Sequence, residues 1–279
     1  MKSIFDTVSR DCSKTVTNSY STSFSLASKL LAPSIRQDVY NVYGFVRFAD
    51  EIVDSFHNYD KETLLNDFEE DLKKAVRDKI SLNPILNSFQ ETVHKFNIEE
   101  EFYMSFLRSM RLDLYKSKYL TKEEYEDYIY GSADVVGLMC LKVFVKGDQQ
   151  KFDDLKEDAM KLGSAFQKVN FLRDLKADLE DLNRSYFPNT NLQKLDENSK
   201  KRIIEEIELD FKAGLKGIQR LPVEAKLGVY TAYVYYLRLL HKLKKTPSLE
   251  IRNKRIRVPN YEKAGLMAKS YVTCRLNLL

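Results

Sequence analysis

The most constraining feature of this sequence is how rarely it interrupts a helix. Only six prolines and nine glycines occur in 279 residues, and every proline falls between segments with helical apolar spacing. No hairpin dipeptide separates two alternating segments, so strands are not expected. The sequence therefore predicts an all-α protein, with helices near 3–31, 34–57, 61–79, 84–97, 99–116, 121–145, 150–183, 196–220, 222–245 and 260–276.

The composition supports a soluble chain with one large core. Hydrophobic residues make up 43% of the sequence and charged residues 31%, with no linker rich in proline, glycine or serine. We therefore predict a single domain over residues 1–279. Long helices joined by short loops pack as a large bundle, which builds its sites between facing helices. The net charge of +4 gives no case for nucleic acid as a partner.

The cysteines and histidines do not indicate a metal site or a disulfide framework. Three of each are scattered along the chain without suitable spacing. The N-terminal residues include Asp6, Arg10 and Asp11 before any apolar run, unlike a secretory signal. No stretch reaches the roughly 20 apolar residues of a membrane-spanning helix. We expect a cytoplasmic protein, with at most a peripheral contact to the inner face of the membrane.

Four aspartate pairs have the i, i+4 spacing that places both carboxylates on one helix face. Two of these pairs, 67/71 and 154/158, lie among Glu and Lys, as on a solvated helix face. The pair Asp50 and Asp54 differs, because "FVRFADEIVDSF" surrounds it with apolar residues. Arg47 precedes Asp50 by three residues and shares its stripe. We predict a site at this pair and none at the first two.

The fourth pair belongs to a longer polar stripe. Gln167, Asn170, Asp174 and Asp178 fall at i, i+3, i+7 and i+11, with apolar residues between them. A purely structural polar network is the alternative, but two facing acidic stripes repel unless a cation lies between them. Mg²⁺ prefers carboxylate and phosphate oxygens, and Mn²⁺ is an alternative ion. The pattern predicts two or three such ions and a metal-assisted loss of diphosphate.

The aromatic residues leave two interpretations open. There are 17 Tyr, 16 Phe and no Trp, and many lie on the segments that carry the polar pairs. Such residues usually fill a core. They can also line an apolar tunnel, where their faces stabilise a cation.

Several motifs together resemble the squalene/phytoene synthase family of head-to-head prenyl transferases. The resemblance implies an isoprenoid-synthase fold with a central active-site cavity, and Mg²⁺ held by Asp50, Asp54, Asn170, Asp174 and Asp178. It extends over nearly the whole chain and rests on "YSTSF" (20–24), "RFADEIVD" (47–54), "YIYGSADVVG" (128–137), "QKVNFLRDLKAD" (167–178), "NRSYFP" (183–188), "YLRLLHKL" (236–243) and "RIRVPNYEK" (255–263).

The resemblance also implies contacts to prenyl diphosphate substrates. Family members often have a histidine before the first serine of the first motif, where this chain has Tyr20. The expected substrate contacts are Ser21, Ser23, Arg47, Tyr128, Gln167, Asn170, Arg173, Tyr236, Arg255 and Lys263.

The reaction implied is phytoene synthesis from two molecules of geranylgeranyl diphosphate, through a cyclopropyl diphosphate and without a nicotinamide cofactor. The first alternative is a relative that uses farnesyl diphosphate to make squalene, dehydrosqualene or presqualene diphosphate. Two further alternatives are an ordinary chain-elongating prenyl transferase and a non-catalytic helical assembly factor. The basic stretch 241–257 is either a contact for anionic lipid or a solvated helix end.

Overall fold

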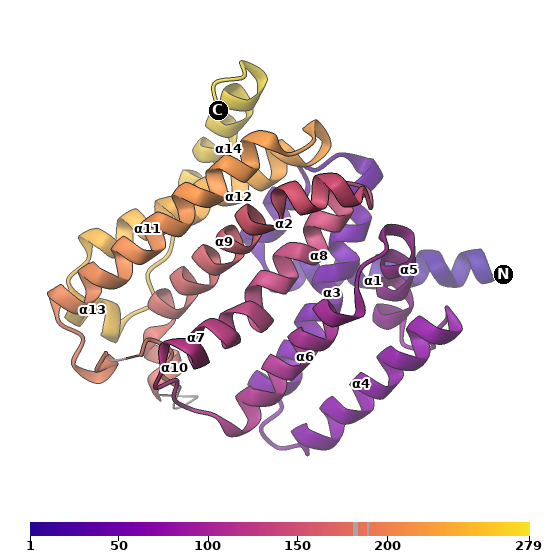
Figure 1. The fold of residues 1–279 in the computed structure, drawn as a ribbon, viewed down its shortest axis with the longest axis horizontal. Helices are drawn as coiled ribbons and strands as arrows, with labels where there is room; N and C mark the ends of the chain where they lie inside the picture. Colours follow the sequence, from indigo (N-terminus) through magenta and orange to yellow (C-terminus); the bar gives the residue numbers. More distant parts are fainter. Residues whose placement is uncertain (181–183, 189) are drawn as a thin grey trace.

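The computed structural model describes residues 1–180, 184–188 and 190–279, and most of them are helical (Figure 1). The all-α prediction is confirmed. Within these ranges, β pairing is limited to one isolated bridge between Lys118 and Ser185. No helix in the described part of the chain is both long and apolar enough to cross a membrane.

The helices follow the predicted ranges closely. Those of the first half are α1 (Lys2–Tyr20), α2 (Thr22–Ser28), α3 (Pro33–Ser55), α4 (Lys61–Asp78), α5 (Pro84–Phe96), α6 (Glu100–Tyr115) and α7 (Lys122–Ile129). A π-helical turn, η1 (Tyr130–Asp134), leads into the second half, which contains α8 (Val135–Phe144), α9 (Gln149–Arg173), α10 (Leu175–Glu180), α11 (Glu197–Arg220), α12 (Val223–Lys245), α13 (Ser248–Asn253) and α14 (Asn260–Arg275), with a short 3-10 turn η2 (Leu192–Lys194) before α11.

The prediction of one continuous helix over residues 3–31 is wrong. Ser21 adopts an extended conformation (φ −141°, ψ 107°) and separates α1 from α2. Its hydroxyl accepts a hydrogen bond from the backbone N–H of Phe24, 3.2 Å away, and so caps α2. Serine supplies this cap without disturbing the apolar spacing, which is why the periodicity alone did not show the break.

The predicted helix 150–183 is also interrupted. Asp174 ends α9 with φ −97° and ψ 9°, and α10 begins at Leu175. Asp178 therefore lies on a separate short helix, not on the same straight stripe as Asn170. Residues 181–183, at the end of the predicted range, lie outside the described residues.

Two further differences concern short elements. The predicted helix 121–145 contains the π-helical turn η1, an irregularity that often marks a functional site. Helix α13 was not predicted, because six residues between Pro247 and Pro259 show no full helical repeat.

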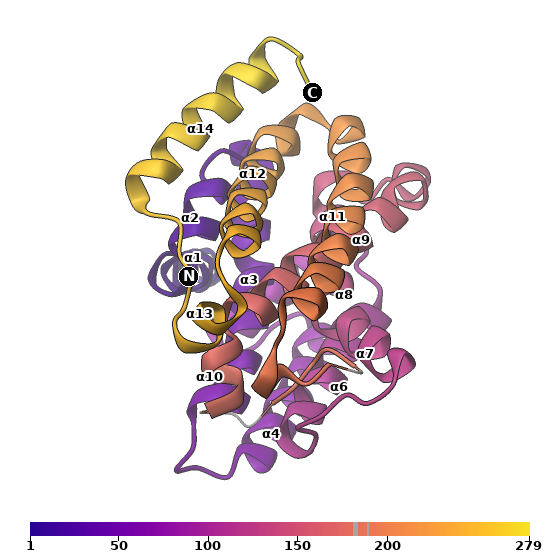
Figure 2. The ribbon, with the colours of Figure 1, turned by 90° about the vertical axis from the view of Figure 1, so that its left-hand side faces the viewer.

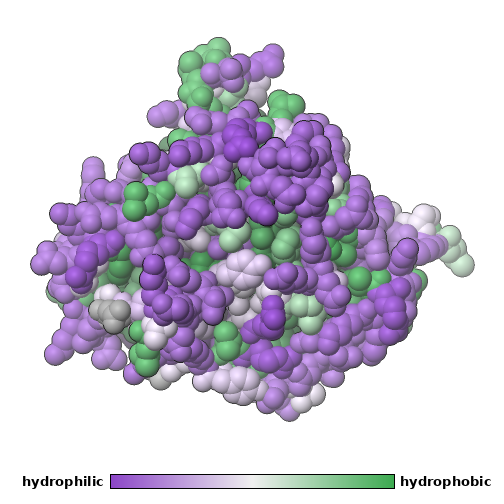
Figure 3. All heavy atoms as spheres, viewed as in Figure 1, coloured by the Kyte–Doolittle hydropathy of each residue, from purple (hydrophilic) through white to green (hydrophobic). Residues whose placement is uncertain are grey.

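Helix α9 runs through the middle of the bundle and packs against α8, α11 and α12 (Figure 1). On the other side, α3 packs against α1, α5 and α6. Helix α14 lies outside the bundle, along α12 (Figure 2). In the view of Figure 3 the surface is mostly hydrophilic, with scattered apolar residues. The arrangement surrounds α9 with helices and gives its apolar face an interior to line.

The close approach of η1 to α6 depends on Gly131. A Cβ atom at this position would lie 1.9 Å from the Ser109 Oγ and 2.8 Å from the carbonyl oxygen of Ser105. The serine hydroxyl can rotate away, but the backbone carbonyl cannot. Gly131 therefore permits a close contact between η1 and α6, and any larger residue would push the two helices apart.

We predict that Gly131→Ala destabilises the fold by about 1–3 kcal/mol, because the added methyl group overpacks this contact. Urea unfolding followed by circular dichroism measures the change. Gly265→Ala in α14 is the matched control, since its Cβ meets no atom within 4 Å. The control should be neutral or stabilising by up to about 1 kcal/mol. Equal stability of Gly131→Ala and the wild type would contradict the packing argument.

Candidate active site

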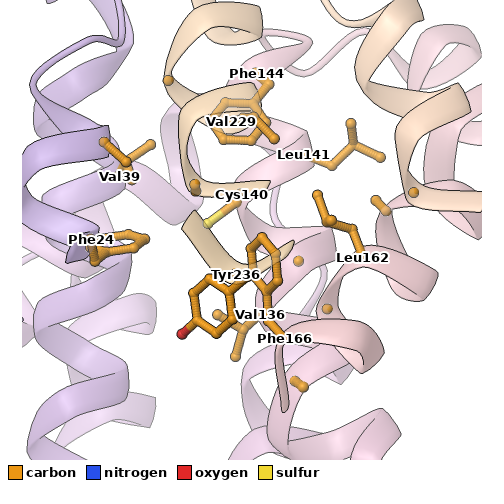
Figure 4. Close-up of a pocket in the computed structure, with 18 of the residues that line it drawn as sticks. Phe24, Val39, Val136, Cys140, Leu141, Phe144, Leu162, Phe166, Val229 and Tyr236 are labelled. Carbon is orange, nitrogen blue, oxygen red and sulfur yellow. The ribbon is translucent and has the colours of Figure 1, made fainter. Parts of the chain in front are cut away.

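An apolar cavity of about 330 Å³ lies along one face of α9. Its α9 residues recur at helical spacing from Leu155 to Asn170, so the lined length is about 22 Å at 1.5 Å per residue. Side chains from α2, α3, α8, α9 and α12 point into the same space (Figure 4). The central cavity expected from the sequence is present.

One end of this cavity is polar, around Ser23, Gln167, Asn170 and Tyr236, and Asp158 adds a carboxylate at the far end. The Tyr236 ring stacks on Phe166 with 4.1 Å between ring centroids. The Oδ1 atom of Asn170 is buried and has no hydrogen-bond partner among the described residues. An unpaired buried acceptor is costly, so this atom is well placed to bind a ligand.

The first acidic motif lies at the C-terminal end of α3. Asp50 Oδ2 is 2.7 Å from the Nη1 atom of Arg47, which also binds Glu51. The guanidinium of Arg47 lies 4.5 Å from the centroid of the Tyr20 ring. Tyr20, where the sequence analysis expected a histidine, therefore helps to hold Arg47 by a cation–π contact.

The second acidic motif lies where α9 passes into α10. Asp174 accepts a hydrogen bond from the Nε atom of Arg173 at 2.8 Å, and its Oδ1 atom forms an ion pair with Arg255 Nε at 2.7 Å. Arg255 comes from the segment after α13, 81 residues away in the sequence. The fold thus brings a distant cation to the acidic residue that ends α9.

The two acidic motifs face each other across a buried arginine. Arg184 Nη1 lies 2.8 Å from Asp54 Oδ1, and its charge also acts on Asp50 and Asp178. Burial, together with the charge of Asp54, raises the pKa of Asp50 to about 7. Burial and the charge of Asp174, with a smaller effect of Asp54, raise the pKa of Asp178 to about 8. The opposed carboxylates are thus close enough to repel one another.

A cluster of cations lies beside Asp174. Burial lowers the pKa of Lys263, and the positive charges of Arg173 and Arg257 lower it further. The same two arginines lower the pKa of Arg255, again after burial. Cations that repel each other in this way favour an anion between them. Arg257 was predicted only as part of the basic stretch 241–257 and not as a site residue, although it lies two residues from Arg255.

Tyr128 does not line the cavity in this structure. Only 2% of its surface is exposed, and its hydroxyl donates to Asp113 Oδ2 at 2.7 Å. A direct substrate contact by Tyr128 stays a prediction, because its hydroxyl is directed at Asp113 instead. Asp113 and Arg184 were not predicted as site residues. Arg184 lies in the motif "NRSYFP". The only feature of the sequence that marks Asp113 is that a single acidic residue stands between two leucines.

The other two aspartate pairs were predicted to lie on solvated helix faces, and this is correct for three of their four residues. Asp67, Asp71 and Asp154 are exposed. Asp158 is not on a fully solvated face. It lines the far end of the cavity, 3.5 Å from Arg220 Nη1. Helix α9 has one face toward solvent and one toward the cavity. The Glu and Lys residues near Asp158 in the sequence did not show that its side chain faces the cavity.

The two interpretations of the aromatic residues apply to different rings. Phe45, Phe68, Phe89 and Phe106 are buried in the core, with Phe45 and Phe89 stacked at 4.2 Å. A second set lines the cavity: Phe24, Tyr43, Phe144, Phe166, Tyr235 and Tyr236.

The donor set fits magnesium only in combination with a substrate. Within the described ranges, no three His, Cys, Asp or Glu side chains converge on one point as a ready-made metal site. Each acidic motif offers two carboxylates, and Asn170 Oδ1 adds an unpaired oxygen. Mg²⁺ is commonly held by one or two carboxylates with substrate phosphates completing its shell. These residues are compatible with that mode of binding.

The basic stretch 241–257 contributes most of a hollow of about 600 Å³, which also includes Arg238. This hollow adjoins the acidic site through Arg255, which pairs with Asp174. Contact of this stretch with anionic lipid stays a prediction.

Comparison with known proteins identifies the family. The sequence profile described as Squalene/phytoene synthase matches residues 17–262. The chain belongs to the squalene/phytoene synthase family. It is 26% identical to phytoene synthase from Arthrospira platensis, over 94% of this chain and 92% of that protein. It is 31% identical to chloroplastic phytoene synthase 2 from Zea mays over 172 residues, which is 61% of this chain but only 42% of the maize protein.

Solved structures of the family share the fold. A dehydrosqualene synthase superposes with a TM-score of 0.82 and 22% identity, covering 97% of this chain and 98% of that one. Squalene synthase HpnC from Alicyclobacillus acidocaldarius superposes with a TM-score of 0.74 and 23% sequence identity. The superposition covers 85% of this chain and 93% of the HpnC chain. At these identities, the likeness extends to the isoprenoid-synthase type of helical fold.

The raised pKa values of Asp50 and Asp178 predict a pH dependence of stability in this family member without metal. Both lie above the ordinary value of 3.8, at about 7 and about 8. Between the ordinary pKa and these raised values, the folded state binds more protons than the unfolded state, so the fold loses stability as pH rises from about 4 to about 8. In EDTA, we expect Tm to fall over that range and to level off above about pH 8.

Asp178→Asn should reduce this slope, because one of the two carboxyl groups no longer titrates. Asp67→Asn, on the exposed face of α4, should keep the wild-type slope. Thermal unfolding followed by circular dichroism measures both variants. An Asp178→Asn slope equal to that of the wild type would contradict the assignment.

Proposed function

We propose that this protein condenses two molecules of geranylgeranyl diphosphate head to head into phytoene, through a cyclopropyl diphosphate intermediate. Membership of the squalene/phytoene synthase family makes the chain a prenyl transferase of the head-to-head type. The observation that carries the finer proposal is the shape of the cavity. It has polar side chains near Asn170 and follows α9 for about 22 Å along a mostly apolar wall, a length comparable with an extended geranylgeranyl chain.

The polar end provides groups for the diphosphates. Arg47 pairs with Asp50, and Arg173 and Arg255 pair with Asp174, which follows Asn170 by one helical turn. Lys263 lies near Arg173, and the Ser21 hydroxyl caps α2. Guanidinium forks match phosphate oxygens well. These residues would bind the two diphosphates and orient the allylic carbon atoms toward the cavity.

Mg²⁺ would be held by Asp50, Asp54, Asn170, Asp174 and Asp178 together with the diphosphate oxygens, in two or three ions, with Mn²⁺ as a substitute. When bound, it would supply positive charge that stabilises the departing diphosphate. The bound cation would in turn reduce the repulsion between these carboxylates.

The apolar wall protects the carbocations that such a reaction forms. Phe166 and Tyr236 are stacked at the polar end of the cavity, where the first allylic cation would arise. An aromatic face can stabilise a desolvated cation by about 2 kcal/mol. The aliphatic remainder excludes water, which would otherwise capture the cation. Phytoene forms by proton loss, so the proposal needs no nicotinamide.

The rival is a reaction on farnesyl diphosphate, giving squalene, dehydrosqualene or presqualene diphosphate. A cavity that holds the longer chain also admits the shorter one, which lacks one five-carbon isoprene unit, and each missing methylene costs about 1–3 kcal/mol. A non-catalytic assembly factor is less well supported, because both acidic motifs are complete and converge at the cavity mouth.

The product assay tests the proposal. With Mg²⁺ and geranylgeranyl diphosphate, we predict that the purified protein makes phytoene without NADPH, and that EDTA stops the reaction. Farnesyl diphosphate should show a lower kcat/KM, because it leaves the far end of the cavity unfilled. Mass spectrometry identifies the products. A preference for farnesyl diphosphate, or a cyclopropyl diphosphate that accumulates until NADPH is added, would favour the squalene-type rival.

Substitution of the aspartates in the two acidic motifs should affect turnover, whereas substitution of an exposed aspartate should not. We predict that Asp50→Asn and Asp174→Asn each lower kcat by about a hundredfold or more, because each removes charge at the diphosphate end. Asp67→Asn should retain wild-type turnover. Steady-state kinetics on proteins with matched circular dichroism spectra measures the effect. Similar activity in all three variants would remove the acidic motifs from the mechanism.

A further inference from the structure

Arg184 is held by two carboxylate-bearing residues from different helices. Only 5% of the residue is exposed. Its Nη1 atom lies 2.8 Å from Asp54 Oδ1 on α3, and its Nη2 atom donates to the Asp113 carbonyl oxygen at 3.0 Å. The carboxylate of Asp113, on α6, is farther away, with 3.8 Å between Oδ2 and Nη1. Arg184 thus has one close carboxylate and a second one just out of hydrogen-bond range.

The Asp113 carboxyl group is poorly partnered for a buried acid, and burial raises its pKa to about 7. Its side chain is 4% exposed, and its Oδ1 atom has no hydrogen-bond partner among the described residues. Oδ2 accepts one hydrogen bond, from the Tyr128 hydroxyl. A buried acceptor without a partner is costly. A guanidinium has five N–H donors in a rigid fork and can satisfy both oxygens of a carboxylate at once.

Arg184 also competes with the proposed cation site. Its fork occupies an oxygen of Asp54, one of the four carboxylates at the cavity mouth. A divalent ion bound to that oxygen would be repelled by a guanidinium that stays in place. Arg184 must therefore move, and a buried arginine needs a new anion when it leaves the old one. The nearest carboxylate available is that of Asp113.

We propose that Asp113 is a positioning residue that takes over Arg184 from Asp54 when a divalent cation and diphosphate enter the site. In the ligand-free structure Arg184 neutralises Asp54, and in the loaded state it pairs with Asp113. The exchange keeps Arg184 neutralised and frees Asp54 for the incoming ion. The inference rests on the proposed cation site but on no property of the prenyl chain.

Tyr128 keeps the receiving carboxylate in place. Its ring packs against those of Tyr119, at 4.6 Å, and Tyr186, at 5.4 Å between centroids. A hydroxyl on a fixed ring holds Oδ2 and leaves Oδ1 open toward a new donor. This explains why a motif tyrosine is buried away from the cavity.

A double-mutant cycle tests the proposal by direct binding. Mn²⁺ binding in the presence of inorganic diphosphate, followed by electron paramagnetic resonance, is measured for the wild type, Asp113→Asn, Arg184→Gln and the double variant. We expect Asp113→Asn alone to weaken Mn²⁺ binding about tenfold, because Arg184 then has no carboxylate except Asp54. In the Arg184→Gln background the same substitution should have little effect. Asp67→Asn is the control for loss of a remote charge.

The cycle separates this role from the other roles Asp113 could have. A direct ligand, or a simple loss of negative charge, would weaken binding equally in both backgrounds and overturn the proposal. A purely structural role would lower Tm without a change in Mn²⁺ affinity and would also overturn it. Coupling in a protein that makes no phytoene would support the exchange and reject the proposed function. Phytoene synthesis without coupling would do the reverse.

Discussion

Repulsion between two pairs of carboxylates is the constraint on which the rest of this site depends. Asp50 and Asp54 end one helix, Asp174 and Asp178 flank the end of another, and the fold turns both toward the same gap. Burial and the neighbouring carboxylates raise the pKa of Asp50 and Asp178 into the neutral range, so these two groups are partly protonated near neutral pH in the ligand-free protein. Arg47, Arg173, Arg184 and Arg255 lie among the four aspartates and offset part of their repulsion. We propose that divalent cations take over this role when substrate binds.

The cavity and the acidic gap are positioned by the same helix. One face of α9 lines the apolar cavity from Leu155 to Asn170, and its last residues carry the second acidic motif. The polar and apolar ends are therefore in fixed register, set by the rise of a single helix. A substrate with a charged head and a long hydrocarbon tail matches this order. The break at Asp174 turns Asp178 into the gap, which a continuous helix would carry past it.

The sequence was sufficient for the helices and for the acidic motifs, because both depend on local spacing. Prolines bound the helices, and the apolar neighbours of Asp50 distinguish it from Asp67, which is exposed. The sequence was not sufficient where tertiary contacts decide. The turn at Asp174 and the burial of Tyr128 depend on residues distant in the chain, whereas the Ser21 cap is local and was missed because it leaves the apolar spacing unchanged. Asp158 looked solvated because sequence neighbours do not show which helix packs beside it.

The most direct test of the account is a crystal structure of the protein with Mn²⁺ and a non-hydrolysable thio-diphosphate analogue of geranylgeranyl diphosphate. The account predicts anomalous difference peaks between the motif of Asp50 and Asp54 and that of Asp174 and Asp178, bridged by diphosphate oxygens. The prenyl chain should follow α9 toward Leu155. Peaks outside the gap between the two motifs, or a prenyl chain outside the cavity, would contradict it.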